Sequence, residues 1–328
     1  MTNPPLLSIG IPVYNSAHCI GEAIESIQAQ TYRNVEIVIC DNCSTDRTRE
    51  ICLEYAAKDD RIRYHRNSTD IGKEPNFLRV LQLATGDFFM WTCADDIRPA
   101  GSLEGLMAAM LRSPQAVMAH GPVVEEAIGS KTILANHMSL MDEDPSERVR
   151  AYVQGVEHNA MQYSVCKTTL LQRAYLTTDF ITNHYGHDYH LCLQMCLLGP
   201  AEYTSMPMIV YREGGEHPNL DPMGPGTQFT IGNSLGGGRA ILKAWTTLLY
   251  GSYYLLRPRE ITLSNRMKSL YAFGSAFIGR YRGRLMRDAV LILTQPLRWL
   301  LSWVWPLARR SSILLALGRK IKAREIGP

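Results

Sequence analysis

The sequence contains neither a GxGxxG loop nor a GxxxxGKS/T loop, the glycine-rich motifs that cradle phosphates in many α/β proteins. A nucleotide that binds here must therefore be held in another way. No internal repeat is evident in the 328 residues, which argues against a solenoid or a propeller. The sequence also lacks an uninterrupted apolar run of ~20 residues, the length that a helix needs to span a bilayer.

The eight cysteines lack the spacing of a disulfide framework. Cys40 and Cys43 form a CxxC pair, and Cys192 and Cys196 lie four residues apart, but no histidine cluster completes a zinc site. Both pairs lie within strand or helix patterns, which favours small buried thiols. The first five residues are polar and contain proline, unlike a secretory leader. We therefore expect a reducing, cytosolic compartment.

Acidic residues are scarce towards the C-terminus. Residues 239–328 hold 17 of the 34 Lys and Arg residues but only 3 of the 31 Asp and Glu residues. Within this basic tail, residues 289–305 are strongly apolar and carry three tryptophans, with Pro296 and Arg298 interrupting the run. Such a segment, flanked by Lys and Arg, is typical of a helix lying in the interface of an anionic membrane. Packing on the body or on a second subunit is the alternative.

A nucleic-acid partner is not expected, because the tail has no known reader motif and its tryptophans lie in an apolar run, not among the basic residues.

Apolar runs alternate with segments of helical periodicity through the first hundred residues. The alternation predicts a mostly parallel sheet with helices on both faces. Ser16 is the expected cap of the first helix, and Ser44 or Thr45 that of the second. The expected strands are Leu7–Val13, Val35–Cys40, Arg61–His65 and Phe88–Trp91.

The pattern after residue 99 is less regular. A hairpin is expected at Val123–Glu126 and Lys131–Leu134, and a helix is expected to open at His187-Asp188. Residues 163–186 show no clear pattern. Further expected elements are a helix through Leu103–Met110, a strand at Ala116–Ala119, a helix at 145–157, a strand at Met208–Tyr211, a mobile loop at 213–238 and helices beyond it.

Polar residues follow three of the expected strands, at the point where each strand ends. They are Tyr14-Asn15, the segment Asp41–Asp46, and Asp95-Asp96. Adjacent aspartates cannot share the core, because unpaired buried charge is very costly. Ligands of open α/β sheets bind at the carboxyl edge of the strands, so these residues predict a site there. An ordinary surface turn is the alternative.

The segments Leu7–Asn15, Ile27–Tyr32 and Glu36–Asp46 resemble, in order and spacing, the N-terminal half of the family 2 inverting glycosyltransferases. Those enzymes have the GT-A fold, with a mostly parallel central sheet and helices on both faces. The resemblance is strong over residues 6–99 and weaker to about residue 212.

Two regions are expected in this chain. The resemblance implies that residues 1–215 form a GT-A domain for nucleotide-sugar binding and catalysis. It does not cover residues 216–328, whose composition predicts a flexible loop and a basic, amphipathic helical region that associates with a membrane.

The resemblance also implies a nucleotide-diphosphate sugar as donor, with a UDP-sugar favoured. Tyr14 would lie against the base, and Asp41 would accept a hydrogen bond from the base. The alternatives are a surface aromatic for Tyr14, a turn or helix cap for Asp41, and a solvated helix start for Lys73. Asp46 fits a cap better than a site. The other implied donor contacts are Pro12, Val13, Asn15, Lys73, Asn76, Asp96 and Arg212.

For the metal, the resemblance implies that Asp95 ligates Mg²⁺ or Mn²⁺, which would neutralise charge on the leaving diphosphate. Asp96 would contact the ribose or support the site. Cys93 stands where the commoner motif has its first aspartate. His217, in the loop, would complete the metal site if the loop closes over the donor.

For catalysis, an inverting transfer needs one general base to take the proton of the acceptor hydroxyl. The resemblance matches Asp188 to that base, with His187 in place of the usual glutamate. His187 would tune Asp188, touch a substrate or share the role of base. The alternative for Asp188 is an aspartate that stabilises the start of a helix.

These implications describe a glycosyltransferase, peripheral on the cytoplasmic face of the membrane, that extends a lipid-linked glycan in bacterial surface polysaccharide synthesis. A nucleotidyltransferase is a rival, although the glycine-rich loop of that class is absent. A sugar-nucleotide-binding protein that has lost activity through the changes at Cys93 and His187 is a second rival.

Overall fold

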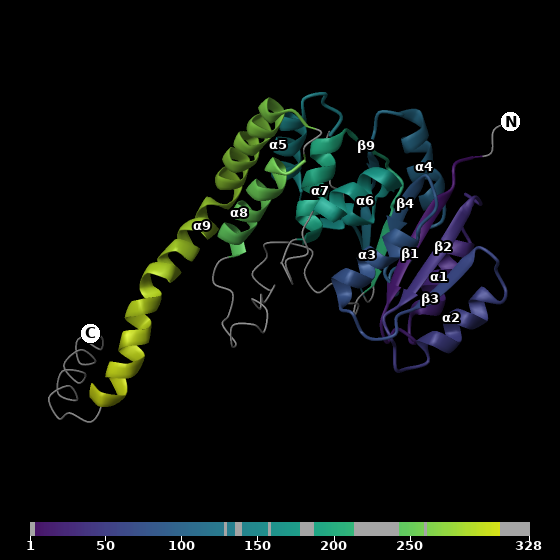
Figure 1. The fold of residues 1–328 in the computed structure, drawn as a ribbon, viewed down its shortest axis with the longest axis horizontal. Coiled ribbons are helices and arrows are strands. Elements are labelled where there is room, and N and C mark those ends of the chain that lie inside the picture. The colour runs from purple at the N-terminus through teal and green to yellow at the C-terminus, as the bar shows by residue number, and fades with distance from the viewer. Residues whose placement is uncertain are drawn as a thin grey trace.

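The computed structural model describes residues 4–127, 130–134, 140–156, 159–177, 187–212, 243–258 and 261–308. Its centre is a seven-stranded sheet in the order β3-β2-β1-β4-β8-β5-β9, accompanied by a three-stranded sheet in the order β10-β6-β7. Helices cover the larger sheet, and the last helix extends away from the body (Figure 1).

The elements have the following bounds. The strands are β1 (Leu7–Val13), β2 (Val35–Asp41), β3 (Ile62–Arg66), β4 (Phe88–Trp91), β5 (Met118–His120), β6 (Val123–Ala127), β7 (Ser130–Leu134), β8 (Val165–Lys167), β9 (Ala201–Tyr203) and β10 (Ile209–Arg212). The helices are α1 (Ile20–Gln28), α2 (Thr48–Ala56), α3 (Lys73–Leu83), α4 (Ser102–Arg112), α5 (Pro145–Gly155), α6 (Thr168–Thr177), α7 (His187–Leu198), α8 (Lys243–Leu256) and α9 (Leu263–Ala308), with a short 3₁₀ helix at Asn159–Tyr163.

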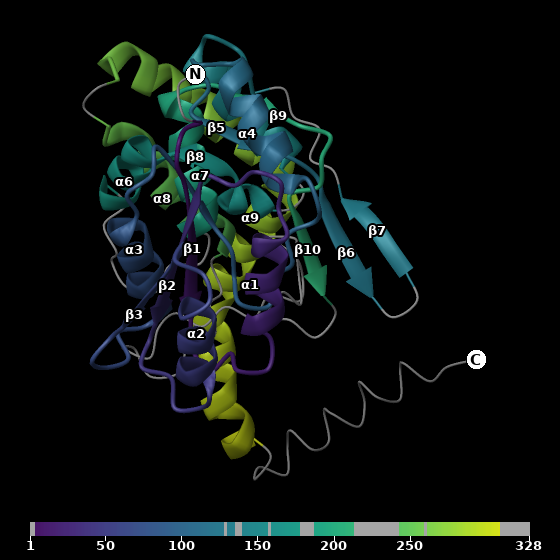
Figure 2. The same ribbon diagram turned by 90° about the vertical axis from the view of Figure 1, so that its right-hand side faces the viewer.

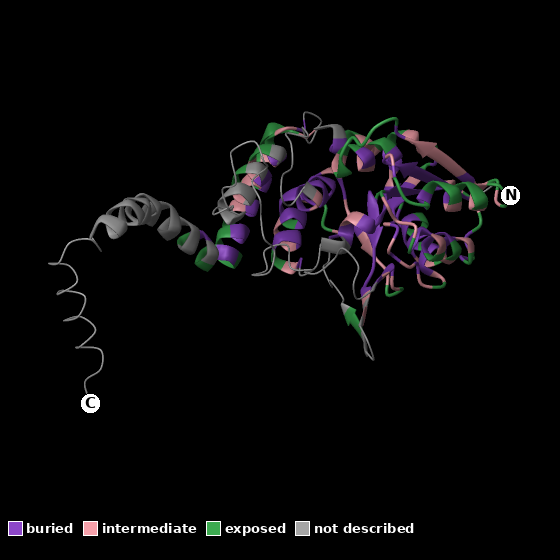
Figure 3. Ribbon diagram, turned by 90° about the horizontal axis from the view of Figure 1, so that it is seen from below, coloured by how far each residue is buried: buried purple, intermediate pink, exposed green. Residues whose placement is uncertain are grey.

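The first four strands run parallel, as the sequence predicts. β1 lies between β2 and β4, and β2 lies beside β3. Every residue of β1 and β2 is buried, because helices cover both faces of this part of the sheet. α1 and α2 lie on one side and α3 on the other (Figure 2). Buried residues gather in the strands and on α7 (Figure 3).

Glycine is required in the middle of β1 because α3 packs closely there. A Cβ on Gly10 would lie 2.5 Å from the Phe89 ring and 2.8 Å from Val80 of α3. Any larger residue would push α3 away from the sheet, and α3 follows the loop that borders the site described below.

Neither expected side-chain cap is present at the start of α1 or α2. α1 begins at Ile20, after a turn in which the Ser16 carbonyl accepts the backbone N–H of Ile20 at 3.0 Å. At α2, the Asp46 carboxylate accepts the backbone N–H of Thr48 at 3.0 Å, and neither Ser44 nor Thr45 caps the helix. Asp46 therefore has the capping role that the sequence favours for it.

The segment 163–186, which the sequence leaves unassigned, supplies β8 and α6. β8 runs antiparallel to both β4 and β5, so the sheet is mostly and not wholly parallel. The expected hairpin is confirmed as the antiparallel pair β6 and β7, and β10 joins it in parallel.

Buried Arg98 connects the two sheets at the end of β4. Its guanidinium donates to the Thr92 hydroxyl at 2.9 Å, to the Met208 carbonyl at 2.6 Å and to the Trp91 carbonyl. Only 2% of Arg98 is exposed, and burial lowers its pKa to about 10. A backbone bridge between Ile97 and Val210 lies beside it. The turn that follows β4 is therefore fixed against β10.

Helices follow residue 242, as expected, and α8 and α9 pack together and against α5 and α7. The Arg280 guanidinium of α9 donates to the carbonyls of Val153 and Gln154 at the end of α5. Among the residues that the structure describes, no helix combines the length and the apolar character needed to cross a bilayer. The expected loop at 213–238 and the basic residues from 309 onward lie outside the described residues.

Replacing Arg98 with methionine should lower the free energy of unfolding by about 3 kcal/mol. The Trp91 carbonyl and the Thr92 hydroxyl would lose the Arg98 donor, and the Met208 carbonyl would keep only the Ser102 hydroxyl. Arg112, whose side chain is 61% exposed, provides the matched control. Arg112→Met should change the stability by less than about 0.5 kcal/mol. Chemical denaturation followed by circular dichroism measures both values, and equal stabilities would contradict the role assigned to Arg98.

Candidate active site

A cavity of about 290 Å³ lies at the carboxyl edge of the parallel strands. Four segments border it: the end of β1 with the turn after it, the end of β2, the loop before α3, and the end of β4. This is the edge at which open α/β sheets bind ligands. Its lining residues are Pro12, Val13, Tyr14, Asn15, Ser16, His18, Cys19, Asn42, Asp70, Gly72, Lys73, Asn76, Phe77, Cys93, Ala94 and Asp95.

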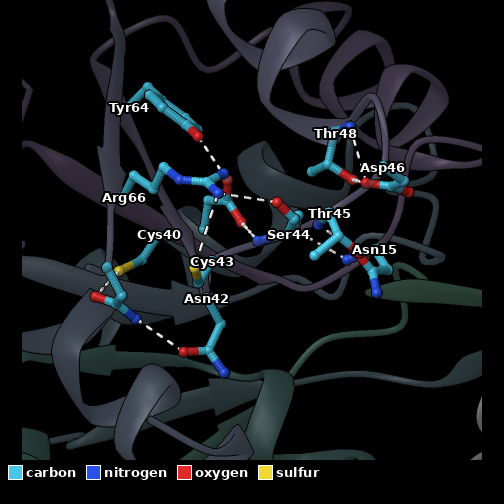
Figure 4. A network of polar contacts seen from close by, with 12 residues as sticks. Asn15, Cys40, Asn42, Cys43, Ser44, Thr45, Asp46, Thr48, Tyr64 and Arg66 are labelled. Atoms are coloured by element: carbon cyan, nitrogen blue, oxygen red, sulfur yellow. Dashed lines mark hydrogen bonds and ion pairs between the residues drawn. The ribbon is translucent and has the colours of Figure 1, made fainter. Parts of the chain in front are cut away.

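The turn after β1 presents an exposed aromatic ring and is held to the turn after β2. Tyr14 is 49% exposed. Asn15 has a positive φ of 48°, and its backbone N–H donates to the Ser44 hydroxyl at 2.9 Å. The Asn15 side-chain oxygen accepts the backbone N–H of Thr45 at 2.8 Å (Figure 4). The two strand ends therefore form one rigid wall with Tyr14 at its surface.

Asp41 lies behind this wall and does not line the cavity. It is fully buried, and its Oδ1 accepts the backbone N–H of Ser44 at 2.8 Å. Its Oδ2 accepts from the Tyr64 hydroxyl at 2.6 Å and from Arg66 at 2.7 Å. Arg66 also donates to the Ser44 carbonyl at 2.9 Å (Figure 4). In this arrangement Asp41 organises the turn after β2.

Three buried asparagines hold the loop before α3 against the end of β2. The Asn67 amide donates to the side-chain oxygens of Asn42 and Asn76, both at 3.0 Å. Asn76 donates to the Cys40 carbonyl at 2.9 Å, and Asn42 donates to Asp70 at 2.5 Å. Asn76 lines the cavity, but its side-chain oxygen and nitrogen both take part in this network. The network places Lys73, at the start of α3, on the rim of the cavity.

The turn after β4 brings together a thiol and two carboxylates. Ligand atoms of Cys93, Asp95 and Asp96 all lie within 4.8 Å of one another. Cys93 and Asp95 line the cavity, whereas Asp96 is only 1% exposed. The Cys93 backbone N–H donates to Asp96 Oδ2 at 3.0 Å, which closes the turn.

The protein alone disfavours ionisation of Asp96 and Cys93. Burial raises the pKa of Asp96 to about 7; the Asp95 carboxylate adds to the rise and the Arg98 guanidinium opposes it. Burial also raises the pKa of the Cys93 thiol well above its usual value, and Asp96 adds to that rise. A divalent cation beside these groups would favour their ionised forms. Asp95 lines the cavity and the Asp96 carboxylate lies close behind it, and this pair of carboxylates fits Mg²⁺ or Mn²⁺.

Asp188 lies at the start of α7, and its Oδ1 accepts the backbone N–H of Tyr189 at 2.9 Å. Burial raises the pKa of Tyr211, and the charges of both Asp96 and Asp188 contribute to that rise. Tyr211 in β10 therefore lies within electrostatic reach of the acidic cluster and of the expected base.

Seven of the expected site residues line the cavity: Pro12, Val13, Tyr14, Asn15, Lys73, Asn76 and Asp95. Asp41 and Asp96 lie behind the lining, and Asp188 lies outside it. The backbones of His187 and Arg212 belong to α7 and β10, but their side chains, and all of His217, lie outside the described residues.

Several lining residues are missed by sequence reasoning, among them His18, Asp70 and Phe77, whereas Asn42 belongs to the expected strand-end segment Asp41–Asp46. Asp70 follows β3, so the rule that polar residues gather at strand ends would have included it. His18 and Phe77 carry no such signal, because only the path of the chain after β1 and into α3 brings them to the cavity.

The family model and the relatives that match this chain are those of glycosyltransferases. A model of glycosyl transferase family 2 matches residues 8–174. Putative glycosyltransferase EpsE of Bacillus subtilis is 36% identical over 109 residues, which are 33% of this chain and 39% of EpsE. UDP-Glc:alpha-D-GlcNAc-diphosphoundecaprenol beta-1,3-glucosyltransferase WfgD of Escherichia coli is 37% identical over 108 residues, which are 33% of this chain and 42% of WfgD. The chain thus spans less than half the length of these relatives.

Solved structures share the fold. TarS 1-349 of S. aureus aligns with a TM-score of 0.58 at 14% identity, covering 84% of this chain and 73% of that chain. The mannosyltransferase PcManGT from Pyrobaculum calidifontis, in complex with GDP-Man and Mn²⁺, aligns with a TM-score of 0.52 at 18% identity, covering 96% of this chain and 84% of that one. These likenesses confirm the expected GT-A fold.

Replacing Asp41 with asparagine should destabilise the fold by about 1–3 kcal/mol. The amide N–H₂ would take the place of one carboxylate oxygen, where it would face either the donors of Tyr64 and Arg66 or the Ser44 N–H. The exposed Asp60 provides the matched control, and Asp60→Asn should leave the free energy of unfolding unchanged. Denaturant unfolding without ligand measures both. If Asp41→Asn had the same free energy of unfolding as the wild type, the network around Asp41 would contribute nothing to the stability of the fold.

Proposed function

Because the chain belongs to glycosyl transferase family 2, we propose that it transfers a sugar, with inversion at the anomeric carbon, from a nucleotide-diphosphate sugar to a glycan. The observation that carries the proposal is the cavity at the strand ends, with an exposed aromatic ring at one wall and the acidic cluster at another. A nucleoside diphosphate needs these two surfaces, one for its base and one for the cation that accompanies its phosphates.

The proposed donor is a UDP-sugar. Tyr14 would lie against the base, with the backbone of Pro12 and Val13 beside it and Asn15 bracing the turn. Lys73 would meet the diphosphate, as would Arg212. TarS has been solved with UDP and with UDP-GlcNAc, and WfgD is named for a UDP-glucose donor. PcManGT was solved with GDP-Man, so a screen of donors must decide which nucleotide base this chain prefers.

The proposed cofactor is Mg²⁺ or Mn²⁺, held by Asp95 with Asp96 behind it. Bound there, the cation would neutralise charge that develops on the leaving diphosphate. PcManGT was solved with Mn²⁺. Asp96 keeps the turn after β4 closed through its bond to the Cys93 backbone. His217 is proposed as a further ligand, contributed by the segment after β10.

Asp188 is proposed as the general base, which would take the proton of the acceptor hydroxyl as its oxygen attacks the sugar. Its position at the start of α7, within electrostatic reach of Tyr211, supports this role. His187, the preceding residue, is proposed to tune that carboxylate. The bond from the Tyr189 backbone N–H holds one Asp188 oxygen in a fixed direction.

The proposed acceptor is a lipid-linked glycan of bacterial surface polysaccharide synthesis. The name of WfgD specifies a diphosphoundecaprenol-linked acceptor, and WfgD is similar to this chain over 108 residues. The rival nucleotidyltransferase would release pyrophosphate instead of the nucleoside diphosphate, so one product assay separates the two reactions. An inactive sugar-nucleotide-binding protein would bind the donor and release neither.

A position on the cytoplasmic face of the membrane is part of the proposal, and the exposed side of α9 supports it. Leu263, Met267, Tyr271 and Ile278 share one side of the helix and are 64%, 51%, 74% and 50% exposed. Residues 263–286 contain no Asp or Glu. An apolar helix face with basic and no acidic neighbours matches an anionic lipid surface.

Asp95→Ala and Asp188→Ala should each lower turnover by about 10²-fold or more, because one removes a cation ligand and the other the base. Release of nucleoside diphosphate from a panel of sugar donors, with and without Mn²⁺, measures this. Asp87 is the control, since it precedes β4 at the opposite edge of the sheet, where it accepts the Leu6 N–H. Asp87→Asn should turn over normally, and wild-type turnover in either alanine variant would refute that residue's role.

Combining Met267→Glu with Tyr271→Glu should weaken binding to vesicles that contain anionic phosphatidylglycerol by more than about tenfold. Each new charge near such a surface costs about 1 kcal/mol, apart from the lost apolar contact. Ile133→Glu, at a 65% exposed position on β7, is the control and should bind as the wild type does. Co-sedimentation measures the partition, and unchanged binding of the double variant would remove α9 from the proposed membrane surface.

A further inference from the structure

Cys93 differs from the other seven cysteines in its surroundings. Six of the eight are buried, and only Cys43 and Cys93 are partly exposed. The Cys43 sulfur lies 3.8 Å from an Arg66 nitrogen and 3.8 Å from the Ser68 carbonyl oxygen. The Cys93 sulfur instead lies within 4.8 Å of carboxylate oxygens of Asp95 and Asp96 and borders the cavity. It is therefore the thiol placed to share a cation with the two carboxylates.

We propose that Cys93 is itself a ligand of the divalent cation, and that its sulfur shifts the preference of the site from Mg²⁺ towards Mn²⁺ and softer cations. This inference rests on the metal dependence that forms part of the proposed function. It assigns the residue at the position of the missing aspartate a direct role in metal binding.

The backbone and one neighbouring hydroxyl set the position of the sulfur. The Cys93 N–H donates to Asp96 Oδ2 at 3.0 Å, so the thiol and that carboxylate belong to one closed turn. The Tyr163 hydroxyl lies 3.1 Å from the Cys93 sulfur. When the sulfur is a thiolate, that hydroxyl can donate to it and stabilise its charge. Tyr163 is 1% exposed, so it holds this position without competition from water.

Coordination by sulfur requires loss of the thiol proton. The S–H bond breaks, the proton leaves to solvent, and the sulfur electron pair forms the bond to the metal. Mg²⁺ is a hard cation that prefers oxygen and keeps several waters, so it gains little from a thiolate. Thiolate ligands favour softer ions, and the affinity of sites with N, O and S donors rises from Mn²⁺ to Cu²⁺, with Zn²⁺ also above Mn²⁺. The carboxylates alone would bind both Mg²⁺ and Mn²⁺ through oxygen. The sulfur would raise the affinity for Mn²⁺ more than the affinity for Mg²⁺.

The experiment uses the full chain and metal ions alone, without a sugar donor. Titration with Cd²⁺, a soft probe ion, should produce the ultraviolet charge-transfer band of a metal-bound thiolate. Cys93→Ser should remove the band and lower Cd²⁺ affinity by about tenfold or more, while Mg²⁺ affinity from calorimetry stays within about twofold. Cys43→Ser, the matched control at the other partly exposed thiol, should keep the band.

Cys93→Asp provides the second variant, because it supplies oxygen in place of sulfur. It should bind Mg²⁺ more tightly than the wild type and should lose the charge-transfer band, with thermal unfolding confirming that it is folded. A band that persists in Cys93→Ser, or a wild type that shows none, would overturn the proposal. The metal measurements do not depend on turnover, so loss of the band in Cys93→Ser would support the ligand role even if no sugar donor were turned over.

Discussion

The buried guanidinium of Arg98 is the constraint on which the geometry of the site depends. Its donors reach the end of β4 through Trp91 and Thr92, and the approach to β10 through Met208. The same positive charge opposes the rise in the pKa of buried Asp96. One side chain thus fixes the turn that carries the acidic cluster and offsets part of its charge. It also sets the position of β10, whose Tyr211 lies within electrostatic reach of Asp188.

Polar residues at the strand ends have two different structural roles. Tyr14, Lys73 and Asp95 line the cavity, where a ligand can meet them. Asp41 instead bonds to Tyr64 and Arg66, and the side chains of the asparagines 42, 67 and 76 bond to one another, although Asn42 and Asn76 also border the cavity. The second group builds the wall from which the first projects. The loop before α3 is therefore held by buried hydrogen bonds, in a sequence without a glycine-rich phosphate motif.

The C-terminal helices contact the part of the body that carries the expected base. α5, α6 and α8 all pack on α7, and α9 packs on α5 and α8. Burial raises the pKa of Tyr189, the residue after Asp188. Tyr281 of α9 adds to the rise, and the Arg280 guanidinium of α9 opposes it. If α9 lay on a membrane surface, the packed helices α5 and α8 would link that surface to α7. The proposed place of the acceptor, at the membrane, agrees with this arrangement.

The sequence by itself determined the positions of the first four strands, their parallel direction and the edge at which polar residues gather, because apolar runs and strand-end polar residues are local signals. The order of the strands within the sheet came only from the structure. It also identified most of the cavity lining on the first and fourth strands. It did not determine the antiparallel β8, since three residues such as Val165–Lys167 carry too short a pattern. The hydrogen bonds that Asp41 accepts from β3, and the contact of the Cys93 sulfur with the Tyr163 hydroxyl, were decided only by the tertiary structure. Those facts depend on Arg66, Tyr64 and Tyr163, which lie 23 to 70 residues away along the chain.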